Sequence, residues 1–311
     1  MTAKIFIDGE AGTTGLQIRE RLAELDTVEV ISIDDALRKD AGARKDMMRS
    51  ADVAILCLPD DAAREAVALA NELGSEAPRI IDASTAHRTA PDWAYGFAEL
   101  EPDNIQANRI ANADRVANPG CYATGAIALL RPLIASGKFA ADYPFTINAV
   151  SGYTGGGKSM IANYEAGTGP VFELYGLKLD HKHLPEVLAH AGLSHAPIFI
   201  PSVGNFAQGM LVSVPLQLGI LDTPPTLAEL DQIFAEFYAG ARAVRYHGFG
   251  DGDVASRLTV DPAKGTDDME IWLYGDDDKR QALLVARLDN LGKGAAGAAV
   301  QNLSLMLGLS A

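Results

Sequence analysis

Hydrophobic and polar residues alternate in blocks up to about residue 118, and these blocks predict strands and helices in turn. The strand-like apolar runs cover residues 4–7, 28–33, 51–58 and 79–82. Two amphipathic stretches, 16–25 and 61–73, have their apolar side chains at helical spacing. Because strands that alternate with helices favour a parallel sheet covered on both faces, we predict an N-terminal α/β domain of the Rossmann type.

The pattern changes near residue 118, and the segments that follow predict an α+β second domain. The expected elements are an apolar helix over 122–135 and strands over 145–150, 198–200 and 210–218. The last segment, 291–309, has no proline and has apolar residues at helical spacing, so we expect a long helix that returns to the first domain. The predicted boundaries are 1–117 completed by 290–311 for the first domain and 118–289 for the second.

Composition narrows the classes of protein. The chain has 311 residues, 48% hydrophobic and 22% charged, which suits two packed cores rather than disorder. A formal net charge of -15 disfavours nucleic acid as a partner, and an anionic small substrate would need a locally basic pocket. We expect no membrane span, no secretory signal and a cytoplasmic location. The 2 cysteines cannot build a disulfide framework, and no Cys/His cluster has zinc-ligand spacing, so no metal is expected.

Three glycines, Gly9, Gly12 and Gly15, lie between the first strand and the first helix. Without side chains they let a pyrophosphate approach the backbone N–H groups at the positive end of the helix, where Thr13 and Thr14 also lie. A tight turn without a ligand is the alternative, but the position between strand and helix favours a dinucleotide.

The residues after the second strand leave the choice of dinucleotide open. Asp34 or Asp35 could hold a ribose hydroxyl, as in NAD enzymes. Arg38 and Lys39 lie close enough in the sequence to meet the 2′-phosphate of NADP instead.

The segment NPGC at 118–121 directly precedes an apolar helix that has no acidic residue in its first turns. A sulfur atom at the N-terminus of a helix is stabilised as the thiolate, so Cys121 is a candidate nucleophile. A buried structural cysteine is the alternative. We adopt that alternative for Cys57, which lies inside an apolar run.

The hexapeptide HKHLPE at 181–186 brings two imidazoles and a carboxylate close to a helix start predicted near Pro185. If the residues before the helix are extended, His181 and His183 share a face. One of them could act as general acid and base to a thiolate, with Glu186 fixing its tautomer. Metal ligation is a rival without an evident third ligand, and surface histidines at a helix start are the structural alternative.

Two other segments could bind an anion. The glycine-rich run SGYTGGGK at 151–158 predicts a flexible loop rich in N–H groups. Arg88 follows the fourth strand at the carboxyl edge of the sheet, where α/β proteins bind ligands. A plain mobile loop and a solvated arginine are the alternatives. Arg88, Lys158 and Lys182 are our candidates for a basic pocket.

Four motifs together resemble the shorter form of the N-acetyl-gamma-glutamyl-phosphate reductase family, which is related to aspartate-semialdehyde dehydrogenases. They are GEAGTTG at 9–15, NPGCYATGA at 118–126, HKHLPE at 181–186 and DNLGKGAAGAAVQN at 289–302. The resemblance implies a Rossmann domain, an α+β catalytic and dimerisation domain, NADP as cofactor, and a homodimer or homotetramer. It also implies reductive dephosphorylation of N-acetyl-gamma-glutamyl phosphate to N-acetylglutamate 5-semialdehyde through a cysteinyl thioester.

The residue patterns and the resemblance together give three groups of candidate site residues. The catalytic group is Cys121, His183, His181 and Glu186, with a slight preference for His183 as the acid–base. The cofactor group is Gly9, Gly12, Thr13, Thr14, Gly15, Arg38, Pro59, Asn290, Lys293 and Gly294. The substrate group is Ser84, Arg88, Asn118, Ser151, Gly152 and Lys158. The alternative functions are an aspartate-semialdehyde dehydrogenase, a non-catalytic dinucleotide-binding regulator and a thiol hydrolase.

Overall fold

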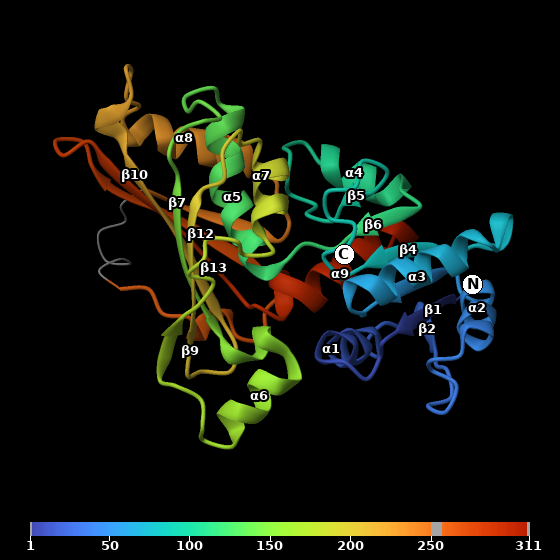
Figure 1. The fold of residues 1–311 in the computed structure, drawn as a ribbon. Coiled ribbons are helices and arrows are strands. Elements are labelled where there is room, and N and C mark those ends of the chain that lie inside the picture. Colours follow the sequence, from blue (N-terminus) through green and yellow to red (C-terminus); the bar gives the residue numbers. More distant parts are fainter. Residues whose placement is uncertain (1, 250–256, 310–311) are drawn as a thin grey trace. The chain divides into compact units, whose positions relative to one another are not determined.

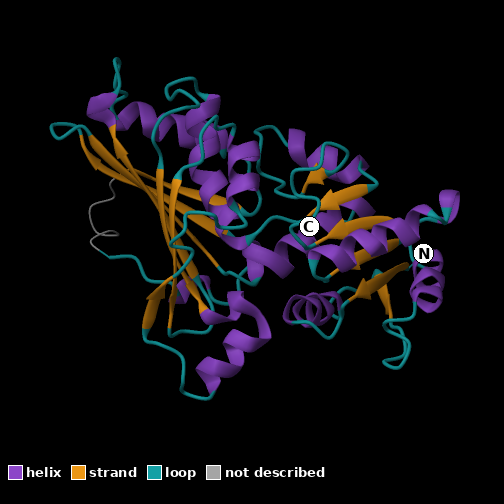
Figure 2. Ribbon diagram, viewed as in Figure 1, coloured by secondary structure: helices purple, strands orange, loops and turns teal. Residues whose placement is uncertain are grey.

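The structure, a computed structural model, describes residues 2–249 and 257–309. It divides into two compact units, and each has a sheet of its own (Figure 2). The first unit consists of Met1–Ala98, Gln106–Gly120 and Ala295–Ala311. The second unit consists of Glu99–Ile105 and Cys121–Gly294.

The sheet of the first unit is parallel throughout, with the strand order β2-β1-β3-β4-β6-β5. Its strands are β1 (Ala3–Asp8), β2 (Val28–Ile31), β3 (Val53–Leu56), β4 (Arg79–Asp82), β5 (Ala94–Tyr95) and β6 (Arg115–Ala117). The central strand β3 is buried along its whole length, as a parallel sheet between two helix layers requires. The predicted Rossmann architecture is confirmed.

Helices cover both faces of this sheet (Figure 1). They are α1 (Thr13–Leu22), α2 (Ala41–Ser50), α3 (Asp60–Asn71), α4 (Ile105–Asn112) and α9 (Gly297–Leu307). Ile5 and Ile55 pack with Leu303 of α9 on one face, while Phe6 packs with residues of α2 and α3 on the other. The predicted return of the C-terminal helix is confirmed, although the segment opens with a π-helical turn, Gly292–Ala296, before the α-helix.

Helix α2 of the first unit has no clear apolar stripe and is not predicted from the sequence pattern. The buried side chains of α2 are only Arg44 and Met48. This helix is instead marked by its N-cap, because Asp40 accepts a hydrogen bond from the N–H of Ala43 at 2.8 Å. The sequence feature that could have predicted α2 is therefore its N-cap residue rather than the spacing of its apolar residues.

The second unit contains a mixed sheet with the order β11-β12-β13-β10-β7-β9-β8. Its strands are β7 (Thr146–Gly152), β8 (Phe172–Leu174), β9 (Ile198–Gly204), β10 (Met210–Gln217), β11 (Val244–Phe249), β12 (Met269–Asp276) and β13 (Gln281–Leu288). The pairs β7/β9 and β11/β12 are parallel, and the other neighbours are antiparallel. The predicted α+β class is confirmed.

One face of this second sheet carries a layer of helices (Figure 1). The helices of the second unit are α5 (Cys121–Ala135), α6 (Gly157–Glu165), α7 (Leu184–Ala191) and α8 (Leu227–Phe237). Helix α5 packs on β10 and β13 and also contacts α7 and α8. It lies so close to β10 that a Cβ atom at Gly125 would come within 2.7 Å of the Val212 side chain.

Side chains on the opposite face of the second sheet alternate with those beneath the helices. They line a hollow of about 730 Å³ whose walls are mainly apolar and include Val150, Leu211, Leu283 and Val285. We call this surface the hollowed face. Leu283 is 36% exposed there, which is unusual for a leucine inside a sheet.

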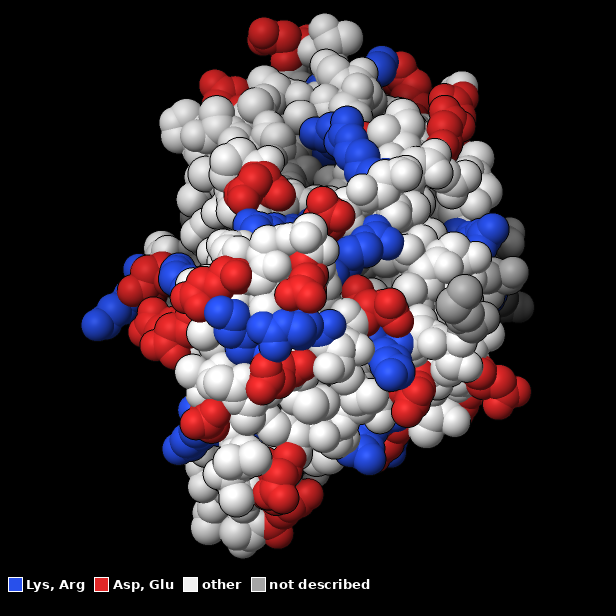
Figure 3. All heavy atoms as spheres, turned by 90° about the vertical axis from the view of Figure 1, so that its right-hand side faces the viewer, with Lys and Arg blue, Asp and Glu red and all other residues white. Residues whose placement is uncertain are grey.

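The described part of the chain, 2–249 and 257–309, has no helix that is both long and apolar enough to cross a bilayer. Figure 3 shows acidic and basic side chains interspersed over the face that it displays. The formal charge of -15 therefore does not form a single acidic surface on that face.

Candidate active site

The loop between β1 and α1 lies so close to neighbouring backbone that its glycines cannot carry side chains. A Cβ atom at Gly9 would overlap the carbonyl oxygen of Cys57, and one at Gly15 would lie 2.7 Å from the carbonyl oxygen of Gly9. Gly12 precedes the helix without a side-chain cap, so the first N–H groups of α1 are not covered by a capping side chain. This cradle at a helix N-terminus fits the pyrophosphate of a dinucleotide.

Two arginines lie near the end of β2. Arg38 is exposed, and its guanidinium lies 3.9 Å from the carboxylate of Asp35. Arg19 of α1 reaches this edge as well: it donates a hydrogen bond to Ser32 Oγ at 3.2 Å and contacts Glu10. Arg19 is a basic candidate that the sequence analysis missed, because only the packing of α1 beside β2 brings it there.

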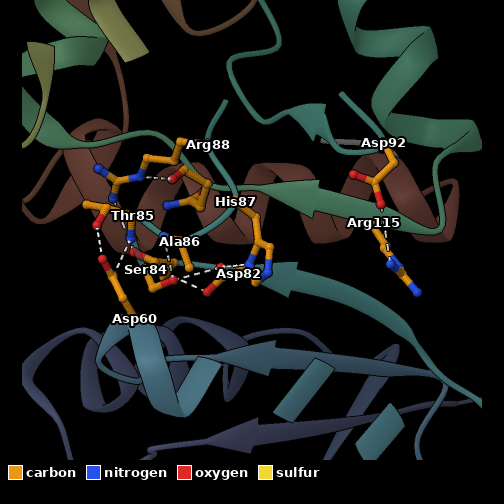
Figure 4. Close-up of polar contacts among 11 residues, drawn as sticks. Asp60, Asp82, Ser84, Thr85, Ala86, His87, Arg88, Asp92 and Arg115 are labelled. Carbon is orange, nitrogen blue, oxygen red and sulfur yellow. Dashed lines mark hydrogen bonds and ion pairs between the residues drawn. The ribbon is translucent and has the colours of Figure 1, made fainter. Parts of the chain in front are cut away.

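Asp82 ends β4, and its fully buried carboxylate organises the loop that follows (Figure 4). It accepts hydrogen bonds from the Ser84 N–H at 2.9 Å and from the Ser84 hydroxyl at 2.7 Å. His87 Nδ1 lies 2.6 Å from the same carboxylate, and its ring stacks on Trp93 with the centroids 4.2 Å apart. Ser84, a predicted substrate ligand, thus directs its hydroxyl to the loop's own carboxylate.

Arg88 closes this loop and is only 8% exposed. Its Nε donates to the carbonyl oxygen of Asn118 at 2.9 Å. The amide of Asn118 is itself held by the C-terminal segment: Nδ2 donates to the Ala295 carbonyl at 2.9 Å, and Oδ1 accepts from Asn302 at 3.0 Å. Asn118 therefore fixes the backbone directly ahead of Cys121 and orients Arg88.

Cys121 is the first residue of α5, and the first turn of that helix has no acidic residue. The residue is partly exposed rather than sealed in the core. A Cβ atom at Gly294 would lie 2.9 Å from the Cβ of Cys121, so only glycine leaves room beside the thiol. In the same segment Asn290 accepts from the Gly209 N–H and donates to Thr154 Oγ1, each at 2.9 Å.

Lys293, a predicted cofactor residue, lies in a buried environment. It is 1% exposed, and its Nζ lies 2.6 Å from the carboxylate of Glu99, which is also buried. The two side chains form a buried ion pair within the second unit.

The rings of Tyr122, His181 and His183 form an aromatic cluster next to the start of α5. The two histidine centroids are 4.7 Å apart, and they lie 5.8 and 6.0 Å from the centroid of Tyr122. The Tyr122 hydroxyl donates to the Ser202 carbonyl at 2.8 Å, which fixes its ring. The residues before α7 form a turn rather than the extended segment considered above, yet the histidine rings still meet. Both histidines thus contact the residue that follows Cys121.

The two histidines differ in their surroundings. His181 Nδ1 accepts a hydrogen bond from the His183 N–H at 3.1 Å, and His181 Nε2 lies 3.3 Å from the Tyr175 hydroxyl. Burial, with a smaller contribution from Lys182, lowers the pKa of His181 to about 4, so this ring is neutral at pH 7. His183 Nε2 lies 4.0 Å from the carboxylate of Glu186. His181 is therefore suited to positioning, and His183 to proton transfer.

Tyr175 belongs to the same cluster, although no motif in the sequence identifies it. Burial raises the pKa of its hydroxyl, a hydrogen bond with Tyr122 lowers it, and the charges of Cys121 and Glu173 raise it further. The ring centroid of Tyr175 lies 6.4 Å from that of Tyr122 and 5.6 Å from that of His181.

The glycine-rich run at 151–158 does not form the predicted flexible loop. Ser151 and Gly152 end β7, the next residues form a 3₁₀ turn, and Lys158 lies in the first turn of α6. Gly152 donates to the Gly209 carbonyl at 2.9 Å and lies directly against residue 207. The prediction was wrong because pairing of β7 with β10 and the start of α6 both reach into the run. Lys158 and Lys182 are exposed.

Cys57 has the environment of a structural cysteine. Burial and the nearby carboxylates of Asp82 and Asp8 raise the pKa of its thiol to about 12. Among the residues that the structure describes, no three His, Cys, Asp or Glu side chains are arranged to hold a metal ion.

Family models match most of the chain. Residues 4–108 match the semialdehyde dehydrogenase NAD-binding domain, and residues 121–290 match the semialdehyde dehydrogenase dimerisation domain. Among solved structures, aspartate semialdehyde dehydrogenase II of Vibrio cholerae shares the fold with a TM-score of 0.72 and 16% identity, over 99% of this chain and 98% of that chain. The Candida albicans enzyme with NADP has a TM-score of 0.64 at 13% identity, over 99% of both chains.

Two curated relatives are far more similar in sequence. N-acetyl-gamma-glutamyl-phosphate reductase 2 of Nostoc is 53% identical over 98% of this chain and 97% of its own. N-acetyl-gamma-glutamyl-phosphate reductase of Brucella ovis is 55% identical over 99% of this chain and 100% of its own. The chain therefore belongs to the N-acetyl-gamma-glutamyl-phosphate reductase family of semialdehyde dehydrogenase-type oxidoreductases.

Proposed function

We propose that the chain reduces N-acetyl-gamma-glutamyl phosphate to N-acetylglutamate 5-semialdehyde and inorganic phosphate with NADPH, through a thioester on Cys121. The observation that carries this proposal is the position of Cys121 at the first residue of α5, next to a tyrosine whose ring contacts two histidines. Identity of 53 to 55% to reductases named for this substrate supports the same reaction.

The cofactor is NADPH, and the first unit has the groups to hold it. Gly9, Gly12 and Gly15, with the backbone N–H groups of Thr13 and Thr14, suit the pyrophosphate. The 2′-phosphate would be bound by Arg38 and by Arg19 and Ser32, two residues near the end of β2 that the sequence motifs did not identify. Pro59, at the N-terminus of α3, completes the cofactor group of the first unit. Asn290 and Gly294 of the second unit are assigned to the cofactor by the resemblance alone. When bound, the nicotinamide supplies the hydride.

Cys121 acts as the nucleophile. At the N-terminus of α5 its sulfur is favoured as the thiolate, and the bare Gly294 leaves space for the acyl group beside it. Sulfur attacks the acyl carbon, the carbon–oxygen bond to phosphate breaks, and phosphate leaves. The resulting thioester is a better hydride acceptor than an oxygen ester would be. Backbone N–H groups in the first turn of α5 are available to the oxyanion.

His183 carries the proton. It takes the proton of the Cys121 thiol, donates one to the oxygen that develops negative charge, and recovers it when the carbon–sulfur bond breaks to release the aldehyde. Glu186, 4.0 Å from His183 Nε2, stabilises the protonated ring. His181 is a positioning residue, because its Nδ1 accepts the backbone N–H of His183.

The substrate's anionic groups are met by Arg88, whose guanidinium is oriented by backbone carbonyls, with Lys158 as a second and exposed cation. Ser151 and Gly152 supply polar groups at the end of β7. Ser84 and Asn118 act by shaping the loops that carry Arg88 and Cys121.

The test is a spectrophotometric assay in the reverse direction. The purified chain receives N-acetylglutamate semialdehyde, phosphate and NADP⁺, in parallel with aspartate semialdehyde and with NAD⁺. We expect phosphate-dependent reduction of NADP⁺ with the acetylated aldehyde. Preference for aspartate semialdehyde would overturn the substrate assignment. Binding of NADPH without any turnover would favour a regulator, and hydrolysis without nicotinamide would favour a thiol hydrolase.

The second unit is a dimerisation domain by its family match, and we propose a homodimer that pairs the hollowed faces of two copies. The apolar hollow suits burial against a second apolar surface.

A further inference from the structure

A second apolar surface continues from the edge of the hollowed face. Residues 171–179, which we call the strap, comprise β8 and the turn after it. Of the twelve large apolar residues that are most exposed in the described part of the chain, five lie in this strap. They are Val171 at 83%, Phe172 at 56%, Leu174 at 49%, Leu177 at 71% and Leu179 at 56%. Single exposed apolar residues are common, but five within nine residues mark a surface that another molecule covers.

The strap and the hollowed face are continuous. Phe172 and Leu174 line the hollow together with residues of β7, β9 and β10. Strand β8 is the edge of the sheet, pairing only with β9 among the described strands, from Phe172 opposite Gly204 to Leu174 opposite Ser202. An edge strand with exposed apolar side chains is a natural surface for another chain. The occupant that fits is a second copy, since the same domain is matched as a dimerisation domain.

The strap also forms one wall of the catalytic cluster. Tyr175 lies between the exposed residues, with its N–H donating to the Pro201 carbonyl at 3.2 Å and its hydroxyl 3.3 Å from His181 Nε2. The backbone at Gly176 lies beside the same imidazole, where an added Cβ would stand 3.7 Å from His181 Cδ2. The His181 ring in turn accepts the backbone N–H of His183. A displacement of the strap would therefore shift the His181 ring, and through it the backbone of the proposed acid–base residue His183.

The turn of the strap has an unusual backbone. Leu179 has φ +60°, and its N–H donates to the Gly176 carbonyl at 3.0 Å. A leucine in the left-handed region is disfavoured and persists where surrounding contacts hold it. Leu177, inside this turn, is 71% exposed and so has few such contacts within its own chain.

We propose that the strap of one copy is covered by the second copy in the homodimer, and that this cover holds Tyr175 against His181, so that the acid–base site is complete only in the dimer. The proposal rests on the function proposed above. It predicts that turnover per chain falls when the dimer dissociates, whereas affinity for NADPH does not, because the glycine turn proposed for the pyrophosphate belongs to the first unit and the strap belongs to the second.

The test compares Leu177→Glu with a matched control, Ile220→Glu. Leu177 and Ile220 are both exposed apolar residues of the second unit, at 71% and 60%. Ile220, however, lies outside the strap and does not line the hollow. Mass photometry and assays over a dilution series give the dimer fraction and kcat for each protein. We expect Leu177→Glu to weaken dimerisation at least tenfold and to lower kcat in proportion to the monomer fraction, with KM for NADPH unchanged. Ile220→Glu should match the unmodified chain.

A readout that is independent of activity separates this inference from the proposed function. Hydrogen exchange of peptides covering 171–183 should be slow in the dimer and at least tenfold faster in monomeric Leu177→Glu, while peptides of β10 stay protected. If the unmodified chain has no reductase activity, the proposed function fails. The exchange measurement alone then tests whether a second copy covers the strap. The inference is overturned if Leu177→Glu dimerises normally, if its monomer has full kcat, or if exchange of 171–183 does not depend on dimerisation.

Discussion

The buried ion pair between Lys293 and Glu99 offers a strong test of how the second unit is held together. Its atoms lie 2.6 Å apart, and the two side chains are 1% and 6% exposed. At an effective dielectric constant of about 20, unit charges at this distance attract by roughly 6 kcal/mol, and much of this is offset by the loss of hydration. Removal of one partner of a buried ion pair costs about 3–5 kcal/mol.

Lys293→Met is the informative change, because methionine keeps much of the volume and removes only the charge. With a denaturant slope of about 2–3 kcal/mol per molar, the urea midpoint of the second unit should fall by roughly 1–2 M. Removing both charges in Lys293→Met/Glu99→Leu should restore most of this loss, because apolar residues of similar volume can replace a buried ion pair at little cost. Lys279→Met is the matched control: its partner Asp276 lies at a similar 2.8 Å, but the pair is exposed and its removal should not move the midpoint.

Urea unfolding followed by tryptophan fluorescence and circular dichroism checks this series, since Trp272 reports on the second unit. The reasoning is refuted if Lys293→Met unfolds at the same urea concentration as the unmodified chain. It is equally refuted if the double variant is no more stable than the single one, because the cost would then come from lost packing rather than from the loss of the Lys293–Glu99 ion pair.

The remaining predictions concern the catalytic cluster and the cofactor cradle. The pKa of His181 is about 4 in the folded chain and about 6.5 in the unfolded chain, so the folded chain binds fewer protons between these two pH values. The contribution of His181 to the free energy of unfolding is therefore complete above pH 6.5 and is lost as the pH falls toward 4. We expect this loss to be about 1–2 kcal/mol, because the side chain is partly exposed. Urea midpoints from pH 4 to 7 should show this slope and lose part of it in His181→Phe; an identical slope in both would contradict the assignment. Cys121→Ser should lower kcat by more than about 1,000-fold while NADPH affinity, measured by fluorescence titration, is kept; near-normal turnover would exclude the thioester. Gly15→Ala should raise the dissociation constant for NADPH at least tenfold, since its Cβ would lie 2.7 Å from the Gly9 carbonyl, and unchanged binding would remove the cradle from the site.

Much of the fold follows from local pattern. The alternation of apolar runs with amphipathic stretches predicts the parallel sheet, because its central strand β3 is buried on two faces and is therefore continuously apolar. Helix α2 is not predicted by this pattern, because its one buried apolar side chain is Met48 and its other buried residue, Arg44, forms an ion pair with Asp8. The strands β11 to β13 escape it because their apolar faces are shared between α8 and the hollowed face, which only the tertiary arrangement defines.

The site is predictable only as far as the chemistry is local. Cys121 at a helix start can be read from NPGC and the apolar run after it, because the helix N-terminus acts over one turn. The different roles of His181 and His183 cannot be predicted from the sequence, since they depend on Tyr175, Tyr122 and the turn between the two rings. Arg19 and Lys293 depend in the same way on partners, Ser32 and Glu99, that are distant in sequence.

Most of the polar residues in the motifs have hydrogen-bond partners inside their own unit, and this changes what those motifs do. Ser84 binds Asp82, Asn118 binds the C-terminal segment, and Asn290 joins Gly209 to Thr154. Such groups hold backbone in place, so substituting them should disturb stability and kcat together rather than remove one contact to substrate. The reactive set is smaller: a thiol at a helix start and one imidazole beside a carboxylate, with the rest of the motif residues fixing where those two atoms lie.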